Sequence, residues 1–141
     1  MRRVAISARF RGAAAEPAGD PPATDPRATS VAVEATAADG APFAVEEISY
    51  ANHAVFTGPA TFTETGTVWL GAGDEIDVAA VSDGTLGPSA DPDLLHGAVF
   101  YSVVGGRGRF AGATGLITSN FLLRPAAGEF EERWVAVLFL A

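Results

Sequence analysis

Short runs of residues that alternate between apolar and polar dominate the sequence, and this period of two is the spacing of a β-strand. The runs lie at residues 3–10, 31–36, 43–50, 53–57, 61–70, 75–81, 96–104, 116–123 and 130–140. Turn signals that contain glycine separate many of them, at residues 39–40, 71–73, 83–84, 105–106 and 127–128. No stretch keeps a helical period between capping residues. Strands of this length at even spacing predict an all-β sandwich or barrel.

Two junctions decide the expected number of strands. Residues 31–36 and 43–50, joined by a tight turn at Asp39 and Gly40, are typical of a β-hairpin. We expect residues 53–70 to form one strand that bends around Gly58 and Pro59. With residues 3–10 as the first strand, the chain then has about eight strands. A chain of 141 residues is long enough for one domain, and we expect a single domain over residues 1–141.

Residues 11–29 differ in composition from the rest of the chain. They contain four prolines and six alanines and almost no large apolar side chain, so they cannot contribute much to a core. The prolines exclude a helix and a central strand. Two interpretations stay open: a flexible loop, or a lid across the mouth of a pocket, because long loops in compact domains are often functional.

The composition excludes several classes of protein. Without cysteine the chain has no disulfide, no thiolate nucleophile and no cysteine-ligated zinc, and with His53 and His96 as its only histidines we expect no metal site. A net charge of −8 argues against binding to nucleic acid and to anionic membrane surfaces. The longest apolar run, residues 134–141, is far shorter than a membrane span. The N-terminus lacks the apolar segment of a secretory signal, so we expect a cytoplasmic protein.

Two of the expected strands are apolar on both faces, residues 96–104 and the last strand, residues 130–140. An antiparallel strand with one solvated face normally carries polar residues on that face. The sequence contains no helices that could cover the outer face. We therefore expect a homo-oligomer, a dimer or trimer, with these strands at the interface.

The glycine-rich segment at residues 103–115 has the pattern Val-Val-Gly-Gly-x-Gly-x-Phe-x-Gly-Ala-x-Gly. It does not match a dinucleotide-binding loop, because Ala111 stands where the third glycine belongs and a strand, not a helix, follows. We expect no cofactor. The glycines instead predict a sharp corner between two strands, with Phe110 closing one end of a barrel.

This pattern resembles the signature shared by dirigent proteins and allene oxide cyclases. The resemblance continues into residues 133–140 and, more weakly, residues 74–78, and it covers roughly residues 60–141. It implies a calycin-like barrel of eight antiparallel strands that binds a hydrophobic small molecule inside and forms dimers or trimers. In size and architecture the chain is also similar to bacterial spirotetronate cyclases. No catalytic residue is carried over from these families.

The residue types in the chain support only reactions that need few catalytic side chains. Hydrolysis by a nucleophilic serine is excluded because no Gly-x-Ser-x-Gly occurs, which leaves cyclisation, isomerisation or simple binding. The candidate catalytic residues are Glu47, as an inward acid on a strand, and Tyr50 and Tyr101, as phenol donors. The candidate ligand-binding residues are His53, Trp69, Phe100, Arg133 and Trp134. For each of them a rim or packing role is the alternative.

These observations together favour a cofactor-independent cyclase or isomerase that acts on a hydrophobic natural-product intermediate inside the barrel. Two alternatives stay open. One is a non-catalytic carrier of a hydrophobic small molecule, and the other is a dirigent-type protein that guides the stereochemistry of a reaction run by another enzyme.

Overall fold

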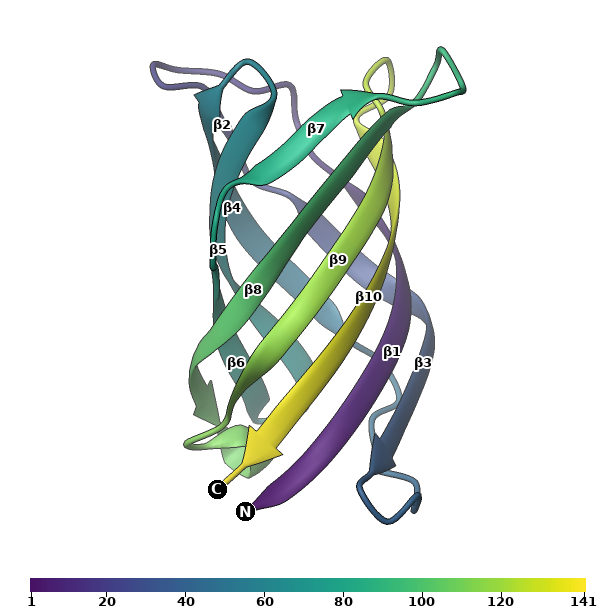
Figure 1. Cartoon of the computed structure of the whole chain (residues 1–141), viewed down its shortest axis with the longest axis vertical. Coiled ribbons are helices and arrows are strands. Elements are labelled where there is room, and N and C mark those ends of the chain that lie inside the picture. Colours follow the sequence, from purple (N-terminus) through teal and green to yellow (C-terminus); the bar gives the residue numbers. More distant parts are fainter.

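The structure, a computed structural model, describes the whole chain, residues 1–141, as one domain of ten β-strands and one short 3-10 turn. Figure 1 shows these elements in chain order. Their bounds are β1 (Arg2–Ala13), β2 (Ala23–Thr24), β3 (Arg27–Ala37), β4 (Ser49–Gly58), β5 (Thr61–Gly71), β6 (Asp74–Ala80), β7 (Gly84–Pro88), β8 (Leu95–Arg107), η1 (Gly108–Phe110), β9 (Thr114–Arg124) and β10 (Glu129–Leu140). No helix in the structure has the length and apolar character needed to cross a membrane.

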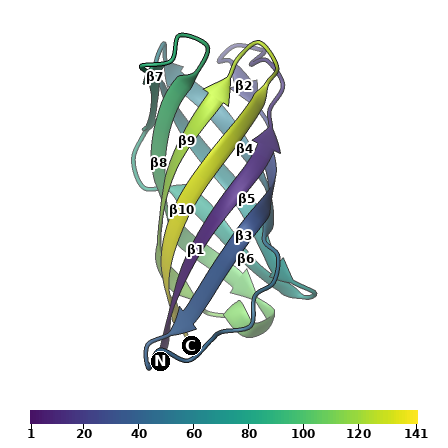
Figure 2. The same cartoon turned by 90° about the vertical axis from the view of Figure 1, so that its right-hand side faces the viewer.

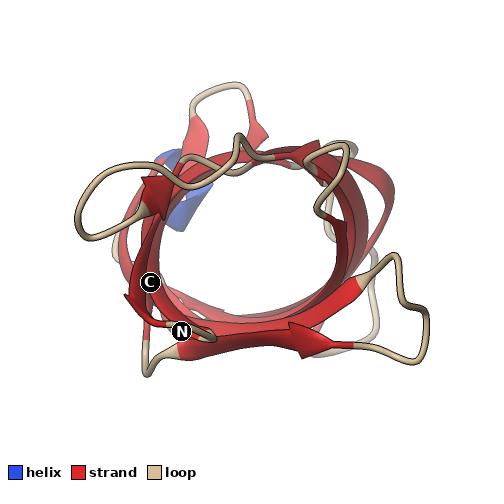
Figure 3. Cartoon of the chain, turned by 90° about the horizontal axis from the view of Figure 1, so that it is seen from above, coloured by secondary structure: helices blue, strands red, loops and turns tan.

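Eight of the strands close into an antiparallel barrel, which confirms the predicted fold class. Around the ring the order is β1, β3, β4, β5, β6, β8, β9 and β10, so each strand lies beside its neighbour in the sequence. The last strand then pairs with the first along its whole length, from Arg2 opposite Leu140 to Ala13 opposite Glu129. Figure 2 shows β1 and β10 side by side, and Figure 3 shows the closed ring from its end. Full closure leaves the barrel without an exposed sheet edge.

The two remaining strands lie near one end of the barrel. β2 pairs with β4, Ala23 opposite Val55. β7 pairs with both β5 and β8 and so continues the wall beyond the end of the shorter β6. Figure 1 shows both at the top, the end opposite the chain termini.

Two details of the predicted strands are wrong. The tight turn at Gly40 is present, with a φ of 85°, but residues 43–48 do not form a strand. They run beside β3 without a regular ladder, held by backbone hydrogen bonds from Phe43 to Ala35 (2.9 Å) and from Ser30 to Ile48 (2.7 Å), and they bury Phe43 and Ile48 in the core. The predicted antiparallel neighbour is therefore right, and only the second strand of the hairpin is missing. Residues 53–70 are not one bent strand either. They lie in β4 and β5, which reverse tightly at residues 59–60 and pair with each other.

The end of the barrel near the termini is packed solid. Phe110, carried by η1, is fully buried, and its ring meets that of Phe43 edge-on at 6.0 Å. Asp74 fixes this corner by accepting hydrogen bonds from the backbone nitrogen and the Nε of Arg109. The prediction that Phe110 closes one end of the barrel is confirmed.

The glycines of this corner differ in their roles. Gly105 and Gly106 still belong to β8, and the chain reverses only at Gly108, where φ is +66°. Gly106 is needed for another reason: a side chain there would strike the backbone carbonyl oxygen of Phe110. The expected reversal at residues 105–106 is therefore displaced by two residues, because β8 continues its pairing with β6.

The proline-rich segment is shorter than predicted, since β1 extends to Ala13 and β3 begins at Arg27. The loop between them is tied to β4 by backbone hydrogen bonds of 2.9 Å, from Phe56 to Pro22 and from Asn52 to Pro26. It lies at the rim of the barrel end that η1 does not fill (Figure 1).

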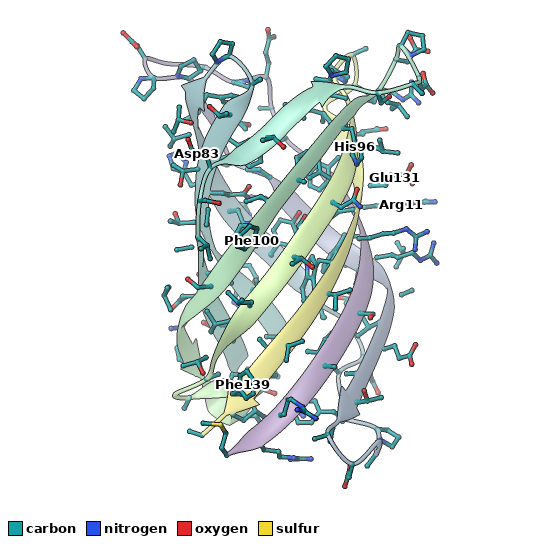
Figure 4. All side chains as sticks on the ribbon, viewed as in Figure 1. Arg11, Asp83, His96, Phe100, Glu131 and Phe139 are labelled. Carbon is teal, nitrogen blue, oxygen red and sulfur yellow. The ribbon has the colours of Figure 1, made fainter.

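The outer faces of β8, β9 and β10 carry exposed apolar side chains. Their exposed fractions range from 39% to 63%, at Phe100, Val104, Leu116, Val135 and Val137. Figure 4 shows Phe100 on the outer wall of β8 and Phe139 near the end that holds the termini. The expected apolar character of both faces is confirmed for residues 96–104 of β8 and for β10, and Leu116 of β9 adds to the same surface.

Candidate functional site

A cavity of about 80 Å³ lies inside the barrel, towards the end away from the termini. On a scale of about 10–15 Å³ for each enclosed water, this is room for roughly five to eight waters or one small ring. Its apolar wall comes from the upper halves of the strands and from β7, and Ala14, Thr24 and Pro26 of the proline-rich loop border it. Six aromatic side chains line it: Tyr50, Phe56, Phe62, Tyr101, Phe121 and Phe130.

Two carboxyl groups face this apolar cavity. Glu64 lies on β5 and Glu132 on β10, and both side chains are buried. Strand alternation places them there, because Glu64 shares the inward face of β5 with Phe62, and Glu132 shares that of β10 with Trp134. A buried carboxyl group is costly unless it is hydrogen-bonded or neutral, so these two positions are the most unusual in the interior.

Both oxygens of Glu132 accept hydrogen bonds. The hydroxyl of Tyr50 donates to Oε1 at 2.5 Å, and the hydroxyl of Ser119 donates to Oε2. Burial raises the pKa of Glu132 to about 7, an effect that outweighs the lowering by its two donors, and the Glu64 carboxyl raises it further. Near neutral pH this group is therefore present in both its protonated and its ionised form.

Glu64 has a different partner. Its Oε2 accepts a hydrogen bond of 2.6 Å from Nδ2 of Asn52, on the neighbouring strand β4. Burial raises the pKa of Glu64, and the hydrogen bond from Asn52 opposes this. Gly66, opposite Asn52 in the β4–β5 pairing, leaves the space that the Asn52 amide occupies, since a Cβ there would overlap Oδ1. That Oδ1 atom is buried and has no hydrogen-bond partner.

The two tyrosines stay protonated. Burial raises the pKa of Tyr50 well above its usual range, and the negative charge of Glu132 adds to this. Burial also raises the pKa of Tyr101 well above its usual range, with Glu64 as the next cause. Both phenols are therefore hydrogen-bond donors at neutral pH: Tyr50 donates to Glu132, and Tyr101 is a hydrogen-bond partner of Glu64.

This arrangement can transfer protons in a water-poor space. A general acid or base works best when its pKa lies near the working pH, and Glu132 meets that condition. The chain has no cluster of three or more histidine, aspartate or glutamate side chains arranged to hold a metal ion.

Three of the residues predicted from the sequence lie at this site. Tyr50 and Tyr101 line the cavity. Trp134 is buried two residues beyond Glu132 on the same face of β10. It borders a smaller space that Tyr50, Tyr101 and Glu132 also line.

The other five predicted residues lie outside the barrel. Glu47 is exposed in the irregular segment before β4, so it is not an inward acid on a strand. His53, Trp69, Phe100 and Arg133 occupy the outward positions of their strands, where alternation turns their side chains away from the cavity. His53 is paired with Asp25 at 2.8 Å on the surface.

Sequence reasoning missed the two interior carboxyl groups and their partners Asn52 and Ser119. The signal was available for both acids. The threonines at 61, 63, 65 and 67 occupy one side of β5, which leaves Glu64 on the side of Phe62 and Val68. By the same parity, placing Trp134 inward also places Glu132 inward.

A scan of protein families, a search of curated proteins and a search of solved structures found no match to the chain. The resemblance to allene oxide cyclases and dirigent proteins therefore remains a prediction from the glycine-rich pattern.

Proposed function

We propose that the protein is a cofactor-independent isomerase or cyclase that acts on a hydrophobic small molecule inside the barrel. The observation that carries this proposal is Glu132, a buried carboxyl group with a pKa of about 7 on the wall of an apolar cavity. Enzymes use burial in this way to tune carboxyl groups for proton transfer at neutral pH.

The proposed chemistry moves a proton within the substrate. The ionised Glu132 accepts a proton from a carbon of the substrate, and the carboxylic acid so formed returns it at another atom, so no oxidant or reductant is needed. Tyr50 and Ser119 donate to the carboxylate and hold it in place. Tyr101 supplies a phenol that can donate to an oxygen of the substrate.

The size of the cavity limits what enters it. At about 80 Å³ it holds a small ring or the reacting end of a longer molecule, whose remainder extends towards the proline-rich loop. In this proposal the loop borders the substrate and is a candidate lid. A natural-product intermediate with a long chain fits this description only when it enters end first.

The presence of a tuned acid favours catalysis over the alternatives. A carrier or a dirigent-type protein needs an apolar surface of the right shape, and an interior carboxyl group would lower its affinity for hydrocarbon. In this proposal the buried Glu132 serves proton transfer, which a carrier of hydrocarbon does not require.

Isomerisation of cyclohex-3-enone to cyclohex-2-enone, followed by its ultraviolet absorbance, tests the proposal with a ring of suitable size. We expect the wild-type protein to accelerate the reaction and Glu132→Gln to slow it by about 100-fold or more, the usual contribution of a general base. Glu131→Gln removes a carboxylate from the adjacent exposed position and serves as the matched control. Equal rates for wild type and Glu132→Gln would contradict the proposal.

A further inference from the structure

The charges inside the barrel are unbalanced. Glu64 and Glu132 are buried and face the cavity, whereas all nine arginines and both histidines are exposed. Each carboxylate is hydrogen-bonded only by neutral groups, which are Tyr50 and Ser119 for Glu132 and Asn52 and Tyr101 for Glu64. The interior thus offers negative charge without a positive partner from the chain itself.

The aromatic walls of the cavity also favour a positively charged ligand. Six aromatic rings line it, and the face of an aromatic ring attracts a cation. Phe62 and Phe121 meet edge-on at 6.2 Å, and Phe121 and Phe130 at 6.4 Å, so these rings form a continuous aromatic wall. An anionic ligand would face two carboxyl groups and no cation.

The hydrogen-bond inventory points in the same direction. The hydroxyls of Tyr50 and Ser119 already donate to Glu132, and the amide of Asn52 already donates to Glu64. The hydroxyl of Tyr101 also faces Glu64 and lowers the pKa of that carboxyl group by hydrogen bonding. A ligand that brings donors therefore fits better than one that brings acceptors, and an ammonium group carries three donors and no acceptor.

A metal ion would fit these groups less well. The cavity offers two carboxyl groups and no third histidine, aspartate or glutamate, whereas calcium and magnesium require six or more oxygen ligands. An organic cation instead divides its contacts between the carboxylates and the apolar wall.

We propose that the ligand of this cavity carries a protonated amine, which pairs with the carboxylate of Glu64 near the second negative charge of Glu132, while its hydrocarbon part packs against the phenylalanines and Glu132 remains the base. The inference takes the site from the proposed function and adds the substrate class. Pairing with a carboxylate offsets the cost of removing an ammonium group from water.

Three probes of equal length test this charge preference on the wild-type protein at pH 7. They are n-butylamine, which is cationic, 1-butanol, which is neutral, and butyrate, which is anionic. Isothermal titration calorimetry should give an affinity for butylamine about tenfold or more above that for 1-butanol, because charge-assisted hydrogen bonds are the stronger kind. Butyrate should not bind. Equal affinity for the amine and the alcohol, or binding of butyrate, would overturn the inference.

Charge-removing variants locate the effect. Glu132→Gln and Glu64→Gln should each weaken butylamine binding by about tenfold and leave 1-butanol binding unchanged, which also shows that the cavity is still formed. Glu131→Gln, the exposed neighbour, should change neither affinity. Loss of amine preference in Glu131→Gln but not in the interior variants would overturn the assignment. If a variant binds neither butylamine nor 1-butanol, its cavity is no longer formed, and the three probes on the wild-type protein alone test the charge preference.

The outcome is separable from that of the proposed function. Butylamine selectivity without isomerisation of cyclohexenone would contradict catalysis and support the ligand class. Isomerisation that depends on Glu132, without any preference for the amine, would support catalysis and overturn the ligand class.

Discussion

Glu132 binds a proton more tightly in the folded protein than in the unfolded chain, because burial raises its pKa from an ordinary value of 4.5 to about 7. The folded state is then stabilised at low pH, and this stabilisation is lost as the pH rises through about 7. A shift of this size corresponds to about 3 kcal/mol. We expect the free energy of unfolding of the wild type, relative to that of Glu132→Gln, to fall by about this amount between pH 4.5 and 8.

Urea denaturation at several pH values measures this difference. Glu131→Gln is the control and should follow the wild type, since that side chain is exposed. Glu64 also has a raised pKa, so Glu132→Gln should keep part of the pH dependence. Parallel curves for the wild type and Glu132→Gln would show that the carboxyl group of Glu132 is not perturbed by burial.

For single residues, the sequence predicts which face of a strand a side chain lies on better than it predicts which residues that side chain contacts. Period-two alternation places Trp134 inward and Arg133 outward, so the prediction that both bind the ligand is wrong for Arg133. The same alternation places Glu64 and Glu132 inward. It cannot give the partners of those acids, because Asn52 and Ser119 come from other strands and meet the acids only through the strand register. The prediction of Glu47 as an inward acid is wrong because alternation inside an irregular segment does not define a face.

At the scale of elements, η1 closes one end of the barrel with a single large side chain. The side chain of Phe110 is fully buried, and its removal would leave a cavity that the surrounding strands cannot fill. We expect Phe110→Ala to lower the free energy of unfolding by about 3–5 kcal/mol, measured by urea denaturation. Val31→Ala, an exposed position on β3, should change it by less than about 0.5 kcal/mol. Equal effects of the two substitutions would contradict the closing role of Phe110.

Strands and corners differ in how well the sequence reveals them. The long strands β5, β8, β9 and β10 agree with their predicted runs to within a few residues, because each keeps one buried face. Residues 43–48 also bury Phe43 and Ile48, yet they meet β3 by backbone hydrogen bonds only at their two ends and form no regular ladder with it. Apolar spacing reports burial, and only pairing with a neighbour makes a strand, which is a property of the whole sheet.

At the scale of the molecule, the barrel has a packed end, a hollow end and an outer apolar surface. The apolar residues Phe100, Val104, Leu116, Val135 and Val137 lie on three adjacent strands, and Ser102 and Thr118 between them are uncharged. Exposed apolar patches of this kind mark association surfaces. We expect the protein to form a homo-oligomer through this surface, with native mass spectrometry giving a multiple of 14.4 kDa.

Charge placed on this surface should break the association. Val135→Glu with Val137→Glu adds two buried charges per chain at such an interface, so this double variant should appear at 14.4 kDa. Thr63→Glu with Thr65→Glu adds the same charge to the exposed face of β5 and should leave the mass of the assembly unchanged. If the wild-type protein has the mass of a single chain, the predicted homo-oligomer is wrong. Because the surface lies on the outside of the barrel wall and the acids face inward, the monomeric variant should keep its interior site and its dependence on Glu132.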